Sequence, residues 1–254
     1  LSTSGTGTEG TDYSTISDIT ISAGDLTGTA SFTPTDDSIY EGNETGVVAI
    51  SSVSGGSATE DGTQSVTITI TENESSPTVT LATSATTIAE NAGSSLTLTA
   101  TSSIVADEDI TVSISTSGTG TEGTDYGTIS DITISAGDTT GTVSFTPSDD
   151  SVYEGDETGI VAIDSVSGAD AAESGTQSVT ITITENESAP TITLATSATT
   201  IAENAGSSLT LTATSSIVAD EDITVSISTS GTGTEGTDYS TISDITISAG
   251  ATTG

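Results

Sequence analysis

Residues 178–184 read Ser-Val-Thr-Ile-Thr-Ile-Thr, and residues 95–101 read Ser-Leu-Thr-Leu-Thr-Ala-Thr. In both stretches an apolar side chain alternates with Ser or Thr at a period of two, which is typical of a β-strand with one buried and one exposed face. No stretch has the spacing of an amphipathic helix, and no run is long and apolar enough to span a bilayer. The sequence therefore predicts an all-β protein without membrane insertion.

The alternating pattern recurs through the middle of the chain, where polar, Gly-rich turns separate short apolar stretches. Seven or eight such strands predict two packed antiparallel sheets, an immunoglobulin-like β-sandwich. The expected strands are 78–82 with 85–88, 95–101, 109–116, 129–135, 140–146, 158–166 and 177–184. The expected inward-facing residues are Val79, Leu81, Ile88, Leu96, Leu98, Val112, Ile114, Ile132, Ile134, Val143, Phe145, Val161, Ile163, Val179, Ile181 and Ile183.

The sandwich is one unit of a tandem repeat. The motif Gly-Thr-Asp-Tyr has its aspartate at Asp12, Asp125 and Asp238, so the period is 125 − 12 = 238 − 125 = 113 residues. This is the size of one sandwich domain and far longer than a solenoid turn. Because the chain begins inside a repeat, we expect it to be a section of a longer array. The expected units are the C-terminal part of one repeat (1–76), a complete repeat (77–189) and the N-terminal part of the next (190–254).

Acidic residues dominate the charge of the chain. It has 37 Asp and Glu, no Lys, Arg or His, and a formal net charge of −37. The densest acidic stretch is 149–157, Asp-Asp-Ser-Val-Tyr-Glu-Gly-Asp-Glu. Its counterpart 36–44 has Asn43 in place of Asp156 and Ile39 in place of Val152. Unit charges about 4 Å apart repel by about 4 kcal/mol at an effective dielectric near 20. Since no side chain can neutralise these carboxylates, the sequence points to a bound metal ion.

The missing residue types exclude several classes of function. Without His, Cys and Lys, the chain lacks most nucleophile–base pairs, Schiff-base chemistry and zinc ligands, so we do not expect an enzyme. Paired carboxylates could serve a glycosidase, but the chain has no aromatic platform for a sugar, and an active site copied in every repeat is not expected. Without basic residues, binding to nucleic acid or to an anionic membrane surface is not expected either.

Calcium is bound by six to eight oxygen ligands, many of them carboxylates. In the complete repeat, Glu90 follows the first strand region, Asp125 precedes the fourth strand, the stretch 149–157 joins the fifth and sixth strands, and Glu185 and Glu187 follow the last strand. In an antiparallel sandwich all these positions can reach one end. We therefore expect loops from distant parts of the chain to form a calcium site there.

Five motifs of the complete repeat carry a family resemblance: Thr-Ile-Ala-Glu-Asn at 87–91, Gly-Thr-Glu-Gly-Thr-Asp-Tyr at 120–126, Ile-Ser-Ala-Gly-Asp at 134–138, the Asp-Asp-x-x-x-Glu-x-x-Glu loop at 149–157, and Val-Thr-Ile-Thr-Ile at 179–183 before an acidic close. Together they span the full period. The chain resembles the Calx-β domain, the calcium-binding sandwich of sodium–calcium exchanger regulatory loops, integrin β4 and very large bacterial surface proteins.

The resemblance implies calcium (Ca²⁺) ligands in every unit. In the complete repeat they are Glu90, Asp125, Asp149, Asp150, Glu154, Glu157, Glu185 and Glu187. The equivalent residues of the preceding unit are Asp12, Asp36, Asp37, Glu41, Glu44, Glu72 and Glu74, and those of the following unit are Glu203 and Asp238. The chain departs from the family at the close, where Glu-Asn-Glu at 185–187 replaces a run of aspartates, and this departure bears on the number of ions and their affinity.

Simpler interpretations of the acidic residues stay open. The stretch 149–157 could be a solvated surface turn that keeps the protein soluble. Asp125 could cap a turn through its own backbone. Glu185 and Glu187 could be no more than a polar linker.

The sequence predicts a structural role: a segment of a secreted, extracellular array at the cell surface, such as an adhesin stalk or a fibre, with calcium ions and neighbouring repeats as its partners. One alternative is a calcium-dependent adhesion module that binds a glycan or a protein ligand on a cell surface. Another is a regulatory calcium sensor. A fourth is a fibre protomer that polymerises head-to-tail with other protomers by strand exchange, although the tail and the head overlap by 254 − 226 = 28 residues in repeat position.

Overall fold

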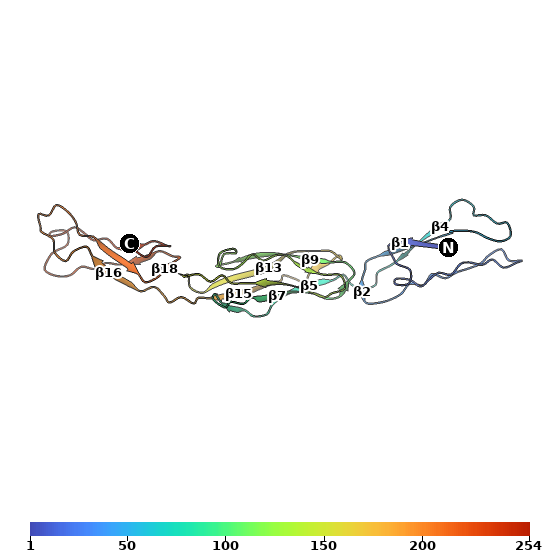
Figure 1. Ribbon diagram of the computed structural model, residues 1–254, viewed down its shortest axis with the longest axis horizontal. Helices are drawn as coiled ribbons and strands as arrows, with labels where there is room; N and C mark the ends of the chain where they lie inside the picture. The colour runs from blue at the N-terminus through green and yellow to red at the C-terminus, as the bar shows by residue number, and fades with distance from the viewer.

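The computed structural model describes residues 1–254 as an elongated molecule in which three β-units follow one another along the long axis (Figure 1). Every regular element is a strand, which confirms the predicted all-β class. The chain contains no helix that could cross a membrane.

The middle unit is a sandwich of a five-stranded sheet, in the order β10-β9-β13-β15-β6, and a four-stranded sheet, in the order β11-β7-β5-β14. Most neighbouring strands are antiparallel, as predicted. The strands of this unit are β5 (Thr78–Thr83), β6 (Thr87–Ala89), β7 (Leu96–Ser102), β8 (Val105–Ala106), β9 (Ile110–Gly118), β10 (Ile132–Ile134), β11 (Thr140–Phe145), β12 (Val152–Tyr153), β13 (Glu157–Ser167), β14 (Ala172–Glu173) and β15 (Ser178–Thr184).

Each sheet also has one parallel edge that the alternating pattern does not reveal. β5 and β6 are close in sequence but belong to different sheets, so the chain crosses between the sheets over residues 84–86. β6 then lies parallel to β15, with Ile88 opposite Ile183, and β14 lies parallel to β5. The parallel edge at β6 has a consequence for function, because it brings the residues that follow β6 and those that follow β15 to the same end of the sandwich.

One strand is shorter than predicted. The pattern predicts a strand over 129–135, but β10 covers only Ile132–Ile134. The carboxylate of Asp131 accepts hydrogen bonds from the amide of Ile114 (3.0 Å) and the hydroxyl of Ser113 (3.2 Å), so it occupies donors on the neighbouring strand. The amide of Ile129 is bound by the carboxylate of Glu122 at 2.7 Å instead of by a strand. Over residues 129–131, side-chain carboxylates thus take the place of the backbone hydrogen bonds that a strand would make.

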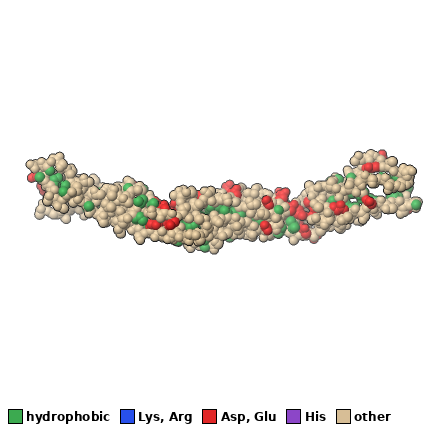
Figure 2. Space-filling view, viewed as in Figure 1, with side chains coloured by type: hydrophobic (Ala, Val, Ile, Leu, Met, Phe, Trp, Pro, Cys, Tyr) green, Lys and Arg blue, Asp and Glu red, His purple; other side chains and the backbone are tan.

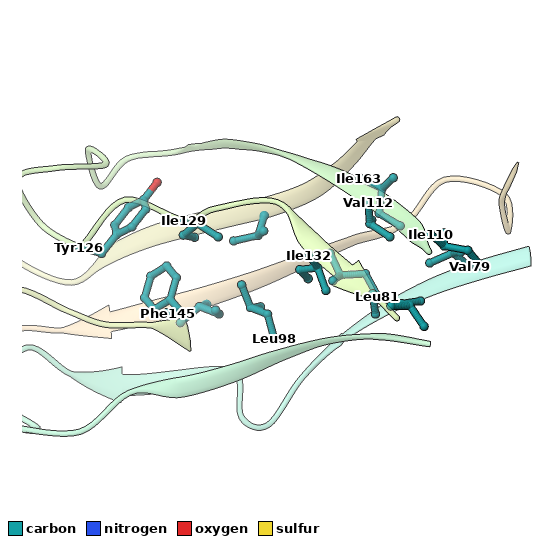
Figure 3. Packing of buried hydrophobic residues seen from close by; sticks show 14 of the residues in the cluster. Val79, Leu81, Leu98, Ile110, Val112, Tyr126, Ile129, Ile132, Phe145 and Ile163 are labelled. Carbon is teal, nitrogen blue, oxygen red and sulfur yellow. The ribbon is translucent and has the colours of Figure 1, made fainter. Parts of the chain in front are cut away.

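The core lies between the two sheets of the middle unit (Figure 3). Tyr126 and Phe145 are fully buried and their rings stack with centroids 4.7 Å apart. Gly159 lies in close contact with both rings. Most of the predicted inward-facing residues are buried, and a few are half-buried at the margin of the core, namely Leu96, Ile114, Val143 and Val179. The predicted inward-facing residues leave out Ala100, Ile110 and Ile129, which are also buried.

The first and third units hold fewer paired strands and expose more apolar surface. Leu26 is 94% exposed and Leu194 is 54% exposed. The first unit has an apolar groove of about 320 Å³ beside Phe32, whereas the repeat counterpart Phe145 is fully buried. The first unit contains β1 (Ser2–Gly5), β3 (Glu44–Ala49) and β4 (Ser65–Ile70) in one sheet, and the third contains β16 (Ile192–Thr196) paired with β17 (Leu211–Ser215) and β19 (Ile223–Val225) paired with β20 (Ile245–Ile247).

Short parallel strand pairs join the units. β2 (Ile39–Tyr40) of the first unit pairs with β8 of the middle unit, and β12 of the middle unit pairs with β18 (Val218–Ala219) of the third. The two joints have the same offset, since 105 − 39 and 218 − 152 both equal 66. β2 and β12 are the central residues of the two acidic stretches, and acidic side chains gather near both joints in Figure 2.

Candidate metal centre

One end of the middle sandwich collects carboxylates from four separate parts of the chain. They come from the end of β6, from the turn at 121–126, from both sides of β12 and from the segment after β15. In each of three overlapping groups the carboxylate oxygens lie within 4.8 Å of one another. The groups are Glu90 with Glu185 and Glu187, Glu90 with Asp150 and Glu154, and Asp125 with Glu154 and Glu157.

Glu90 stands where β6 ends beside β15. Its backbone amide donates to the carbonyl of Thr184 at 3.0 Å, which extends the parallel edge by one residue. Its side chain is only 6% exposed, and one carboxylate oxygen accepts the amide of Asp150 at 3.1 Å. Glu90 is thus held between the end of a sheet and the acidic loop, which explains why it belongs to two of the three groups.

Asp125 closes the tight turn at 121–126. Its Oδ2 accepts the amide of Thr121 at 2.6 Å, and its own amide donates to the carbonyl of Thr121 at 2.9 Å. The turn-capping interpretation therefore describes this residue correctly. The same carboxylate is 9% exposed and also lies in one group with Glu154 and Glu157, so capping the turn does not remove it from the cluster.

Glu185 folds the acidic loop onto the end of β15. Its Oε2 accepts the amides of Glu154 (2.7 Å) and Gly155 (2.8 Å), and its Oε1 accepts the amide of Glu187 (2.9 Å). This residue is therefore more than a polar linker. Oε2 of Glu187 is buried without any hydrogen-bond partner. An orphaned, buried carboxylate oxygen of this kind is one that a bound cation satisfies.

The carboxylates at this end alter one another's pKa. Burial, and next the charges of Asp125 and Glu157, raise the pKa of Glu154 to about 7. Burial and the charge of Asp125 likewise raise the pKa of Glu157 to about 7. Burial alone would also raise the pKa of Glu185, but the backbone amides of Glu187, Glu154 and Gly155 outweigh it and lower this pKa to about 2. The end of the sandwich thus holds negative charge that nothing in the protein neutralises.

The first unit repeats this arrangement. Oxygens of Asp12, Glu41 and Glu44 lie within 4.8 Å of one another, and burial, followed by the charge of Asp12, raises the pKa of Glu41 to about 7. Glu72 takes the place of Glu185 and accepts the amide of Glu41 at 2.6 Å. Asn43, the one amide in the acidic stretch, accepts the amide of Glu72 at 2.9 Å through its side-chain oxygen.

Its counterpart Asp156 accepts the amide of Glu185 at 3.0 Å in the same way. Asp or Asn can therefore stand at this position, because it supplies a hydrogen-bond acceptor and lies outside the carboxylate groups.

The remaining sequence-predicted ligands lie outside these groups. Asp37 caps the loop by accepting the amide of Ile39 at 2.8 Å, and Asp36 accepts the side-chain amide of Asn73 at 3.1 Å. In the third unit the counterparts of Glu90 and Asp125 are both exposed. The predicted residues that the structure does not bring into a group are Asp36, Asp37, Asp149, Glu72, Glu74, Glu203 and Asp238.

Two acidic residues near the clusters were not predicted. Asp107 follows β8, and its charge helps to raise the pKa of Glu41 and of Glu44 in the preceding unit, after burial and the charge of Asp12. Asp220, its repeat counterpart, acts on Glu157 in the same way across the second joint, after burial and Asp125. The signal in the sequence is that Asp107 and Asp220 are separated by one repeat period, 220 − 107 = 113 residues. The sequence does not connect these two aspartates with the carboxylate clusters, because each Asp lies at the opposite end of its own unit. Each approaches the cluster of the preceding unit only across the joint.

A protein-family model matches the chain in three consecutive segments. The Calx-beta domain family matches residues 1–74, 72–187 and 185–252, which together span nearly the whole chain. Among solved structures, the apo form of the Calx CBD1 domain matches with 18% sequence identity and a TM-score of 0.37, covering 43% of this chain and 98% of the solved chain. A comparison with curated proteins finds no match.

The chain belongs to the Calx-beta domain family, as the tandem repeat of three β-units and the five sequence motifs predicted. Calx-beta domains are β-sandwich modules associated with calcium binding.

Proposed function

We propose that the chain is a calcium-binding structural segment of a long extracellular array, in which calcium at the end of each unit stabilises the joint with the next. The observation that carries the proposal is the convergence of carboxylates from four parts of the middle unit, with their oxygens within 4.8 Å, in a chain that has no Lys, Arg or His. Carboxylates packed this closely are stable only when some of them are protonated or when they bind a cation.

The donor set fits calcium. It consists of carboxylate oxygens, which suit a hard cation with flexible coordination, and Oε2 of Glu187 is buried without a partner. The residues that would hold calcium are the members of the three groups, Glu90, Asp125, Asp150, Glu154, Glu157, Glu185 and Glu187. A bound calcium supplies positive charge at this end of the sandwich. The protein contributes the positions, because Glu90 and Glu185 are fixed by the parallel pair of β6 and β15.

The location of the site supports a role in stiffness. Each cluster is adjacent to a parallel strand pair that joins two units, and the charge of Asp107 or Asp220 faces it from the next unit. Neutralising the cluster removes repulsion across the joint. An extracellular stalk or fibre suits repeated, acidic units whose joints use the same strand pairing, because length and rigidity are the useful properties of such an array.

Calorimetric titration of the 254-residue chain with Ca²⁺ and with Mg²⁺ tests the proposal. We expect Ca²⁺ to bind and Mg²⁺ to bind far more weakly, because Mg²⁺ demands a near-ideal octahedron and dehydrates reluctantly. Glu154→Gln removes a carboxylate shared by two of the groups and is expected to weaken calcium binding to the middle unit by roughly tenfold or more.

Asp138→Ala is the matched control, since it removes one carboxylate at an exposed position outside the groups, and the third unit carries Ala251 at this repeat position. It is expected to leave calcium binding unchanged. No heat of calcium binding to the unmodified chain, or an equal loss of affinity in both variants, would show that the clusters are only solvated acidic surface.

A further inference from the structure

The tip of the acidic loop of the first unit docks onto the middle unit. β2 pairs in parallel with β8, and the amide of Asp107 donates to the carbonyl of Tyr40 at 3.2 Å. β8 is itself held to the middle unit by the amide of Gly137, which donates to the carbonyl of Ala106 at 2.8 Å. The loop therefore adds a short strand to its neighbour, which is a form of β-augmentation.

The side chain of Tyr40 belongs to the core of its neighbour. It is only 7% exposed and lies in the same buried cluster as the residues between the two sheets of the middle unit. Its hydroxyl donates to Oδ2 of Asp170 at 2.9 Å, a bond between residues that are 130 positions apart. A residue of one unit is thus packed and hydrogen-bonded as part of the next.

The turn at 168–171 that receives Tyr40 is conformationally unusual. Ala169 and Asp170 both have φ = 49°, in the left-handed region that Asp tolerates and Ala disfavours. Ala169 is 7% exposed and belongs to the same buried cluster, and its amide donates to the carboxylate of Glu108 at 3.3 Å. A disfavoured backbone persists where the surroundings hold it in place. We call the turn 168–171 together with residues 107–109 the Tyr40 socket.

The second joint provides an internal comparison. β12 pairs with β18, and the amide of Asp220 donates to the carbonyl of Tyr153 at 3.3 Å, so the backbone contacts are the same as at the first joint. Tyr153 is half-buried, whereas Tyr40 is 7% exposed and its hydroxyl donates to Asp170.

We infer that the Tyr40 socket is a docking site for the tyrosine of the preceding unit, and that this docking couples the stability of neighbouring units without a bound cation. Asp170 sets the strength of the contact. The first unit carries Ser57 at the corresponding position, 170 − 113 = 57, and Ser57 has the same left-handed backbone with φ = 56°. The two units therefore have the same backbone conformation at this position. They differ in the side chain offered to the tyrosine hydroxyl, which is Asp170 in the middle unit and Ser57 in the first.

Amide hydrogen exchange of the whole chain, digested with pepsin and measured under chelation, tests the inference. Tyr40→Ala is expected to speed exchange about tenfold or more in residues 106–110 and 168–171 of the following unit, because it empties a buried position there. Tyr153→Ala, the matched control, alters the opposite joint and is expected to leave these two segments unchanged. Unchanged exchange in Tyr40→Ala, or the same change in both variants, would overturn the inference.

A pair of milder variants tests the role of Asp170. Tyr40→Phe keeps the ring and removes the hydroxyl, and Asp170→Ser installs the residue of the first unit. Each is expected to speed exchange at 168–171 about threefold to tenfold, and the double variant is expected to do no more than either one alone, because both remove the same bond. If the double variant speeds exchange by the product of the two single effects, Tyr40 and Asp170 act independently and the hydrogen bond between them does not hold the socket. Since calcium is absent from these measurements, their outcome is separate from that of the calcium titration.

Discussion

Individual carboxylates in this protein take opposite roles according to what surrounds them. Glu185 accepts four backbone amides and has a pKa of about 2, whereas Glu154 is partly buried among other carboxylates and has a pKa of about 7. Glu185 is thus stabilised in its ionised form, whereas ionising Glu154 at neutral pH costs free energy. A cation site needs both kinds, since the first fixes the loop and the second supplies charge for the ion.

The pKa values predict how stability depends on pH when calcium is removed. For Glu41, Glu154 and Glu157 the pKa is about 7 in the folded chain against an ordinary value of 4.5, so their stabilising contribution is full below about 4.5 and is lost as the pH rises through 7. For Glu72 and Glu185 the pKa is about 2, so their contribution is full above about 4.5 and is lost as the pH falls towards 2.

The chelated protein should therefore be most stable near pH 4.5 and should melt at lower temperatures at pH 7.5. Thermal unfolding followed by circular dichroism from pH 2 to pH 8 measures this. Excess calcium serves as the control and should restore stability at neutral pH. A melting temperature that rises steadily to pH 7.5 in the chelated protein would contradict the electrostatic account.

At the scale of elements, the packing of β13 against the aromatic stack limits what the sandwich tolerates. A Cβ at Gly159 would lie 2.8 Å from the ring of Phe145, so Gly159→Ala forces the stack to move. We expect it to lower the free energy of unfolding by about 1–3 kcal/mol, as overpacking does in well-packed cores. Gly127→Ala is the matched control, because its nearest neighbour would be 3.8 Å away. Urea unfolding of both variants decides the point, and equal stabilities would show that the stack yields at no cost.

The sequence alone predicted the main strands of the sandwich and most of the residues that face inward, because apolar residues alternate regularly with Thr and Ser along those strands. It did not predict the two-residue strands β8, β12 and β14. It could not predict the parallel pair of β6 and β15. That pairing depends on where the chain crosses from one sheet to the other, and the alternating pattern is the same in either sheet. The ends of β10 were mispredicted for a similar reason, since the side chain of Asp131 takes a place in the ladder that periodicity assigns to backbone.

The candidate site was predictable in part. Glu90, Asp125 and Glu154 stand in recognisable motifs, and the structure brings each of them into a group of carboxylates. The burial of Tyr40 in its neighbour was not predictable, because the partner residue Asp170 lies in a different repeat and in an irregular turn. Contacts between units depend on how the units are placed end to end, which leaves no periodic signal within either unit.

At the scale of the whole molecule, the charge of −37 and the linear arrangement of units act together. Like charges that face each other across a joint, such as Asp107 and Glu44, push neighbouring units apart. The strand pairs and the docked Tyr40 hold the units together against this repulsion. Calcium at the joints would shift the balance towards a straight and rigid array.

Small-angle X-ray scattering of the 254-residue chain, with millimolar calcium and after chelation, tests this central claim most directly. The account predicts that calcium narrows the distribution of interatomic distances around an extended rod and raises the melting temperature measured in parallel. Potassium chloride at matched ionic strength is the control, because simple screening would act on every surface charge alike. If calcium and chelator give the same maximum dimension and the same melting temperature, calcium does not stiffen the joints and the account is wrong.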